Sequence, residues 1–386
     1  MSFGTLAIIV VVGLIGPMLS LSTRGRVPLV VGELLVGVVL GASGIGALRA
    51  DQPTFAFFGS LGFALVMFVA GSKVPMRDSA LRAGLAAGVG RAVLVGAAAA
   101  VAGWAIAGWF ETGNGPLYAV LLASSSAALV LPMVAATGAP SGSSPSGSHP
   151  PFLVQVAVAD VACIVALPLA VDPPGAGRAA LGVLAVAAAA LLAYAFLRWA
   201  ETSGWRKRVH RTSQDHEYVL ELRVALGLLF TLAAIATAGR VSVMVAGFAL
   251  GLAVARVGEP KRVAKQMFAI TEGFAGPLFF IWLGASLNLH DVLDQPSALA
   301  LGAVLGVAAV GVHALGVATG QPWSVAVMTC AQLGVPIAAV TVASAAGRLR
   351  AGEAAALLLG ALVTVAVVTL VARPATEVLG TRPGRT

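Results

Sequence analysis

One carboxylate interrupts a long apolar run in this chain. The run, FLVQVAVADVACIVALPLAV, covers residues 152–171 and carries Asp160 near its centre. A charged aspartate at the centre of a membrane helix costs roughly 2.5 to 3.5 kcal/mol. An acid that is kept at such a position indicates a functional site, and the alternative is a structural aspartate bonded to serines.

Asp160 offers a simple chemistry of exchange. Removal of water disfavours the charged carboxylate and so favours a bound proton, whereas a bound metal cation favours the charged form. A proton and a monovalent cation therefore compete for one carboxylate. Competition at one site that opens alternately to the two sides of a membrane is sufficient for antiport. It requires no second substrate pocket and no cofactor.

Two further apolar segments, LLASSSAALVLP and TCAQLGVPIAAV, combine polar residues with a proline. The first holds Ser124, Ser125, Ser126 and Pro132, and the second holds Gln332, Gly334 and Pro336. Serines can satisfy backbone groups that an interrupted helix frees, and unwound carbonyls can bind a cation. We expect both helices to be discontinuous, with the three serines completing an ion site around Asp160. Packed serines beside an ordinary proline kink are the alternative.

His313 is a second titratable group inside an apolar segment, AAVGVHALGVATG. A lone histidine on an apolar face is usually a packing residue, but opposite a carboxylate it can balance charge or sense pH. The sequence leaves a contact between His313 and Asp160 open. Ala159, directly before Asp160, supplies no polar group. We interpret His313, Gln332 and Ala159 as positions that modulate the site.

Composition defines the elements that must position these residues. The chain has 386 residues, of which 59% are hydrophobic and 10% charged, whereas a soluble domain carries about 25% charged residues. The apolar residues fall into blocks of the length that crosses ~30 Å of hydrocarbon. We therefore expect an all-α polytopic membrane protein in contact with the lipid bilayer. The net charge of +8 does not indicate nucleic-acid binding, because the basic residues cluster in short loops.

We expect about thirteen transmembrane helices. They cover residues 3–22, 27–46, 54–72, 80–108, 116–138, 151–171, 177–200, 217–238, 240–257, 264–288, 296–318, 322–346 and 354–373. The loops on one side receive seventeen Lys and Arg residues, and those on the other side receive five. The positive-inside rule places the basic side in the cytoplasm, and we expect the membrane to be a bacterial inner membrane. The N-terminus is then outside and the C-terminus inside.

Two loops differ from the rest in composition. GAPSGSSPSGSHPP (138–151) has the composition of a flexible linker. GWRKRVHRTSQDHEY (204–218) is strongly charged, and it is either a topology anchor or a contact for lipid headgroups or a partner. We expect no soluble regulatory domain.

The sequence also contains an internal repeat. RVPLVVGELLVGVVL from Arg26 matches RVSVMVAGFALGLAV from Arg240, with Gly37 opposite Gly251. The next pair is ALVMFVAG (64–71) and PLFFIWLG (277–284). Under the expected topology the two copies run in opposite directions, which is typical of secondary transporters. We expect one transmembrane domain with inverted repeats over 3–171 and 217–373, joined by a linking helix over 177–200.

These segments resemble the cation:proton antiporter superfamily of bacterial sodium/proton and potassium-efflux antiporters. The similar stretches are RVPLVVGELLVGVVLGASGIG, GFAGPLFFIWLGASLNL and AVADVACIV, and the resemblance covers nearly the whole chain. It implies a homodimer, a mobile core with two crossing broken helices, and elevator-type movement. It also implies an ion-binding role for Asp160, and it puts His313 where the electrogenic members carry a lysine.

The chain departs from the family pattern in three places. The aspartate usually follows Asp, Asn or Gln, but here it follows Ala159; the lysine is His313; and a common Gly-Glu pair is Gly334-Val335. We predict a monovalent cation/proton antiporter, with Na⁺ favoured over K⁺, and not an enzyme. The alternatives are a sodium-coupled organic anion transporter of related fold and an antiporter-like membrane protein recruited to a non-transport or enzymatic role.

Overall fold

The described part of the chain is helical throughout. The computed structural model describes residues 2–22, 29–74, 79–127, 129–130, 150–205, 208–209, 211–212, 218–258, 261–287, 290 and 295–380. Within these ranges there is no strand, and nine helices are long and apolar enough to cross a membrane. Three shorter apolar helices accompany them (Leu29–Leu40, Val243–Val257 and Gly334–Ala345). The expected all-α polytopic fold is confirmed, and each of the thirteen predicted ranges contains described helix.

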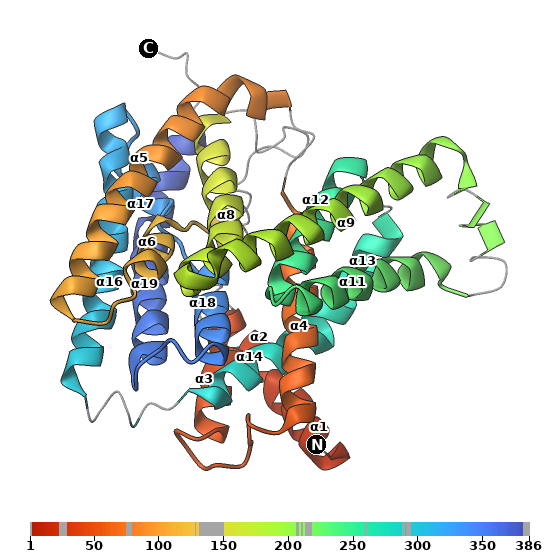
Figure 1. The fold of residues 1–386 in the computed structure, drawn as a ribbon, viewed down its shortest axis with the longest axis horizontal. Helices are drawn as coiled ribbons and strands as arrows, with labels where there is room; N and C mark the ends of the chain where they lie inside the picture. Colours follow the sequence, from red (N-terminus) through yellow and green to blue (C-terminus); the bar gives the residue numbers. More distant parts are fainter. Residues whose placement is uncertain are drawn as a thin grey trace. The chain divides into compact units, whose positions relative to one another are not determined.

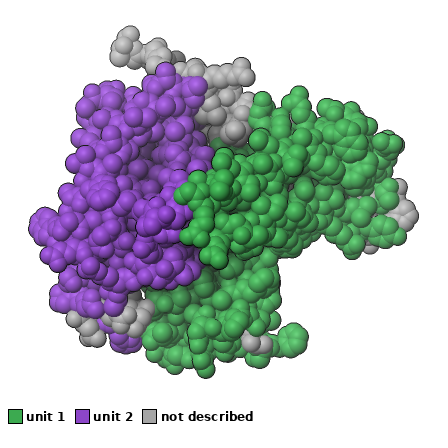
Figure 2. Space-filling view, viewed as in Figure 1, with its two compact units in different colours: residues 1–77, 177–289 green, residues 78–176, 290–386 purple. Residues whose placement is uncertain are grey.

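The chain folds into two compact units (Figure 2). Unit 1 comprises Met1–Arg77 and Gly177–Leu289, and unit 2 comprises Asp78–Ala176 and His290–Thr386. Each unit therefore takes helices from both predicted repeats. The inverted repeat itself stays a prediction. Most of the predicted linker 138–151, and part of the charged loop 204–218, lie outside the described residues.

Unit 1 contains the helices labelled α1–α4 and α9–α14 in Figure 1. They are α1 (Phe3–Gly13), α2 (Ile15–Ser22), α3 (Leu29–Leu40), α4 (Pro53–Ser72), α9 (Ala176–Thr202), α11 (Leu220–Ala238), α12 (Val243–Val257), α13 (Lys261–Ile270), the π-helical turn η3 (Thr271–Ala275) and α14 (Gly276–Ser286). Helix α3 packs on α14, and α4 packs on α12. These two crossings account for much of the contact inside the unit.

Glycines set the close approach at both crossings of unit 1. A Cβ atom built on Gly284 would lie 3.0 Å from the Cα atom of Gly37, and one built on Gly71 would lie 3.1 Å from that of Gly251. The sequence repeat aligns Gly37 with Gly251 and Gly71 with Gly284. The repeat therefore maps one crossing onto the other, as expected for two copies related by a twofold axis.

Unit 2 contains the interrupted helices. Its elements are α5 (Ser79–Trp109), α6 (Gly115–Ala123), α8 (Pro150–Val171), the short 3₁₀ turn η2 (Pro173–Gly175), α16 (Pro296–Ala314), the 3₁₀ turn η4 (Leu315–Thr319), α17 (Trp323–Met328), α18 (Gly334–Ala345) and α19 (Glu353–Gly380). Helix α5 packs along α8, and α16 packs along α19. In its most apolar window α8 is 61% buried, whereas α5 is 17% buried. Helix α8, which carries Asp160, is therefore a central helix of the unit.

The interior of unit 2 is apolar around the interrupted helices. Phe152 on α8, Met328 at the end of α17 and Val368 on α19 belong to one buried cluster. Ala331, between α17 and α18, lies in the same cluster. Burial of this apolar surface fixes the two interrupted helices against α8, so the polar atoms at the interruptions have defined neighbours.

Candidate functional site

The two predicted helix interruptions meet inside unit 2. Helix α6 ends before Ser124, residues 124–126 are not helical, and a helical turn starts again at Ala127. In a continuous helix the N–H of Ser126 would bond to the carbonyl of Leu122. Instead it donates to the carbonyl of Ala331, at 2.8 Å, in the gap between α17 and α18. The predicted pair of crossing discontinuous helices is confirmed.

Asp160 lies at this crossing. Its Oδ2 atom accepts a hydrogen bond from the N–H of Ala127 at 3.2 Å. Asp160 is 7% exposed. Ala127 opens a new helical turn, since the N–H of Val130 donates to the carbonyl of Ser126 at 3.0 Å. The free N–H groups at the start of a helix carry partial positive charge and stabilise a carboxylate. Among the described residues, no side chain donates to Asp160.

The three serines have different partners. The hydroxyl of Ser124 donates to the carbonyl of Leu121 at 2.8 Å, within its own turn. Ser126 takes part through its backbone. The hydroxyl of Ser125 is buried and has no hydrogen-bond partner among the described residues. A buried polar atom without a partner is costly unless a ligand or water satisfies it, so the Ser125 hydroxyl could accept such a partner.

His313 bonds to Thr329. The Nδ1 atom of His313 lies 2.8 Å from the Thr329 hydroxyl oxygen, and either atom can be the donor. The same hydroxyl oxygen lies 2.7 Å from the carbonyl oxygen of Ala326. The Nε2 atom of His313 is buried without a partner in the described chain. The carbonyls of Leu122 and Ser124 lie near the ring but outside hydrogen-bond geometry with Nε2.

Gln155 and Thr329 also lie in this polar cluster, although the sequence interpretation does not include them. The amide Nε2 of Gln155 lies 3.5 Å from the hydroxyl of Thr329. The Oε1 atom of Gln155 and the Nε2 atom of Gln332 are buried without partners in the described part of the chain. Gln155 had a visible signal, because it is a second polar residue in the apolar run that holds Asp160.

The remaining predicted positions also lie in unit 2. Ala159 is buried on α8 and brings no polar atom to the crossing. The described hydrogen bonds join Asp160 to Ala127 and His313 to Thr329, so they do not include a bond between Asp160 and His313. The two titratable groups contact different parts of the crossing.

A second polar cluster surrounds Glu353, at the opposite end of α6 from the crossing. The Oε1 atom of Glu353 accepts bonds from the Tyr118 hydroxyl at 2.6 Å and from the Asn114 amide at 2.7 Å. Its Oε2 atom accepts the N–H of Arg350 at 2.9 Å. The first residue of α19 thus holds the start of α6, which fixes the direction in which α6 enters the crossing.

The comparison with known families identifies the chain. Residues 7–378 match the family described as "Sodium/hydrogen exchanger, transmembrane". The chain belongs to this family. The exchanger is therefore a multi-pass membrane protein of a transporter family, not of an enzyme family, and the resemblance inferred from its motifs is confirmed.

A curated relative and a solved structure agree with the family. The "Na(+)/H(+) antiporter NhaS5" of Synechocystis sp. is 42% identical over 55 residues, which are 14% of the exchanger and 8% of that protein. The sodium proton antiporter MjNhaP1 from Methanocaldococcus jannaschii, solved at pH 8, has the same fold. Its TM-score is 0.62 at 16% identity, with 98% of the exchanger and 97% of that chain covered.

Proposed function

We propose that the exchanger is a monovalent cation/proton antiporter in which H⁺ and the cation compete for Asp160, with Na⁺ preferred over K⁺. One observation carries the proposal: a buried carboxylate meets the N–H of Ala127 where two interrupted helices cross. The non-helical residues 124–126, which directly precede Ala127 in the chain, supply further polar groups in this proposal. Membership of the family supports exchange of a cation for protons as the reaction type.

The proposed ion ligands are the Asp160 carboxylate, the Ser125 hydroxyl and carbonyls of the unwound segment 124–126. Asp160 uses one oxygen for the Ala127 N–H, and that bond orients the second oxygen. When neither ligand is bound, the partial positive charge of the helix start stabilises the empty carboxylate. A bound cation or proton then neutralises the carboxylate, which low-dielectric surroundings favour.

His313 tunes the site in this proposal, together with Gln332 and the small residue Ala159. A proton on Nε2 of His313 would face the carbonyls of Leu122 and Ser124, at the C-terminal end of α6. Positive charge at the C-terminal end of a helix is favourable. Protonation of His313 would therefore strengthen its attraction to these carbonyls, which lie at the interruption that supplies the serine ligands.

Transport in this proposal moves the site as one body. All proposed ligands belong to unit 2, so an elevator movement of unit 2 would carry the ion without dismantling its site. Unit 1 is then the scaffold and the surface through which a homodimer forms. We further propose that residues 3–171 and 217–373 are two copies of one inverted repeat, with the N-terminus outside and the C-terminus in the cytoplasm. The matched glycine crossings support the repeat.

Ion flux into proteoliposomes tests the assignment of Asp160. We expect Na⁺ gradients to drive H⁺ movement, K⁺ gradients to drive less, and Asp160→Asn to abolish both. Asp172→Asn is the matched control, because Asp172 follows the end of the same helix and is exposed. Competition further requires the apparent affinity for Na⁺ to fall as the pH is lowered. Exchange that survives Asp160→Asn would disprove the assignment, and the absence of cation-driven H⁺ movement in the wild type would disprove the function.

A further inference from the structure

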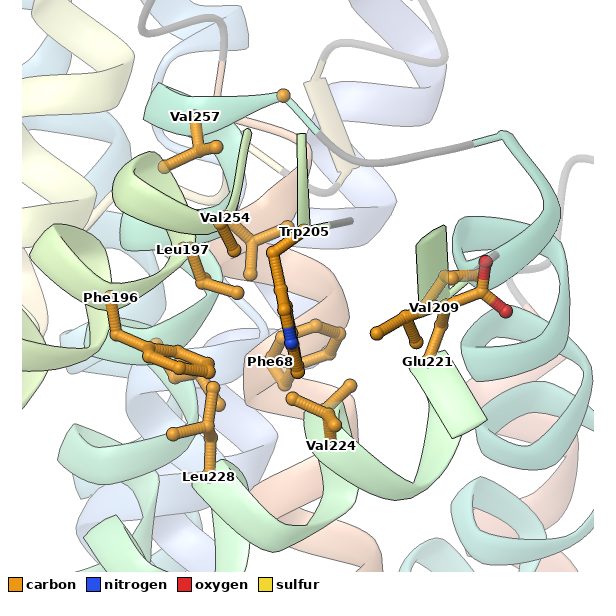
Figure 3. A pocket seen from close by; sticks show the side chains of 15 residues that line it. Phe68, Phe196, Leu197, Trp205, Val209, Glu221, Val224, Leu228, Val254 and Val257 are labelled. Carbon is orange, nitrogen blue, oxygen red and sulfur yellow. The ribbon is translucent and has the colours of Figure 1, made fainter. Parts of the chain in front are cut away.

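An apolar cavity lies inside unit 1, at the ends of α9, α11 and α12 that adjoin the charged loop (Figure 3). Its cavity volume is about 90 Å³, and its mouth is open. Its lining residues are Phe68, Phe196, Leu197, Ala200, Trp205, Val209, Glu221, Val224, Ala225, Leu228, Leu250, Val254, Val257, Gly258 and Val263. These residues come from four transmembrane helices, from the 205–209 segment and from the start of α13.

The lining suits a hydrocarbon. Of the described residues that line the cavity, only Glu221 carries a charge. Trp205, near the centre of Figure 3, is fixed by ring contacts with Phe196 at 5.8 Å and Trp199 at 6.2 Å between centroids. Glu221 lies at one side of the cavity in the same view. Its carboxylate disfavours an anionic group inside the cavity. The remaining apolar lining can still contact a hydrocarbon chain.

Three of the valines that line the cavity each follow an exposed arginine in the sequence. Arg208 precedes Val209, Arg223 precedes Val224, and Arg256 precedes Val257. All three valines line the cavity, and all three arginines are exposed. Successive residues of a helix point about 100° apart, so a lining valine directs its neighbouring arginine toward the side of the cavity. We call these three arginines the arginine rim.

We propose that this cavity binds one acyl chain of an anionic phospholipid, and that the arginine rim holds the phosphate. The lipid belongs to the leaflet that the basic loops face. Every buried methylene and every nearby arginine adds to the affinity for such a lipid. Bound there, the chain would tie the ends of α9, α11 and α12 to α4. The site is separate from Asp160 and does not depend on antiport.

Thermal unfolding of the purified exchanger in neutral detergent tests the site. We would add phosphatidylglycerol, phosphatidylethanolamine or phosphatidylcholine with identical acyl chains. Phosphatidylglycerol should raise the unfolding temperature at the lowest concentration, because ligands that bind the folded state stabilise it. Arg223→Gln and Arg256→Gln should each weaken its apparent affinity roughly fivefold. Arg178→Gln, at the other end of α9, is the matched control and should leave the affinity unchanged.

Two further variants separate the chain from the headgroup. Ala225→Phe should fill the cavity and abolish the phosphatidylglycerol effect while the arginine rim is intact. Should that variant fail to fold, the exposed arginine variants still decide the question. Glu221→Gln should keep or strengthen the binding, since it removes a repelling carboxylate. Equal effects of the three phospholipids, no effect of the arginine variants, or a larger shift with free oleate than with phosphatidylglycerol would overturn the proposal.

Discussion

At the residue scale, hydrogen-bond partners distinguish three serines that look alike in the sequence. The hydroxyl of Ser124 donates to the carbonyl of Leu121, whereas the hydroxyl of Ser125 has no partner in the described chain. Ser126 acts through its N–H, which bonds across the interruption to Ala331. In the proposed site, ion binding and helix interruption therefore belong to different members of one SSS run.

We predict that Ser125→Ala raises the KM for the transported cation by about tenfold, because it removes one neutral ligand from a charged guest. The maximal rate and the unfolding temperature should change little, since the hydroxyl makes no hydrogen bond to the described residues. Cation-dependent H⁺ flux in proteoliposomes measures the KM.

Ser124→Ala is the matched control for this prediction. It removes a local hydrogen bond that contributes about 1 kcal/mol to stability, and it should leave the cation KM unchanged. If Ser124→Ala raises the KM and Ser125→Ala does not, then Ser125 is not the serine that contacts the ion.

The same scale explains why His313 does not pair with the carboxylate in this structure. The Nδ1 atom of His313 lies 2.8 Å from the Thr329 hydroxyl, which also contacts the carbonyl of Ala326 at 2.7 Å. The imidazole is therefore held toward the end of α6 rather than toward Asp160. The Thr329 hydroxyl is thus the side-chain partner of His313 among the described residues.

At the scale of elements, the close crossings of unit 1 depend on the absence of side chains. Gly37 and Gly284 let α3 approach α14, and Gly71 and Gly251 let α4 approach α12. A methyl group on any of these residues would meet backbone atoms of the facing helix, which cannot move away as a flexible side chain would.

We therefore predict that Gly37→Ala and Gly251→Ala each lower the free energy of unfolding by about 1–3 kcal/mol, the usual cost of overpacking. The two losses should be similar, because the repeat places both residues at equivalent crossings. Thermal unfolding in detergent compares the variants with the wild type.

Gly227→Ala, on α11 of the same unit, serves as the control. An added Cβ there has open space, so the better helix propensity of alanine should stabilise the helix by up to about 1 kcal/mol. A stable Gly37→Ala variant beside a destabilised Gly251→Ala variant would contradict the equivalence of the two crossings.

At the scale of the whole molecule, each unit is assembled from two separate stretches of chain. The chain passes from unit 1 to unit 2 between α4 and α5, and again between α14 and α16. Each unit therefore combines helices from both predicted halves of the sequence. In the proposed mechanism unit 1 is the scaffold and unit 2 carries the ion.

The proposed topology predicts which loops are accessible from each side of the membrane. A cysteine at Ser203, beside the basic loop, should react with an impermeant thiol reagent only from the cytoplasm, and one at Asp51 only from outside. Both positions are exposed. The native Cys163 and Cys330 are buried, so the unmodified protein gives little background. Labelling from the opposite sides would reverse the proposed orientation but leave the fold intact.

The sequence by itself determined the helical spans and predicted the role of Asp160. Both follow from local physics, because hydrocarbon thickness sets the length of an apolar block and a charge inside it is costly. The prolines and serines likewise indicated two interrupted helices, since they change the hydrogen bonding of their own turn.

Only the tertiary structure decided which groups meet. The bond from Ser126 to Ala331, the bond from His313 to Thr329 and the contact of Gln155 with Thr329 join different helices. Apolar periodicity marks which face of a helix is buried, but these helices have buried residues on most faces, so it cannot name a partner across the interior. That choice depends on how the helices pack, which is a property of the folded chain as a whole.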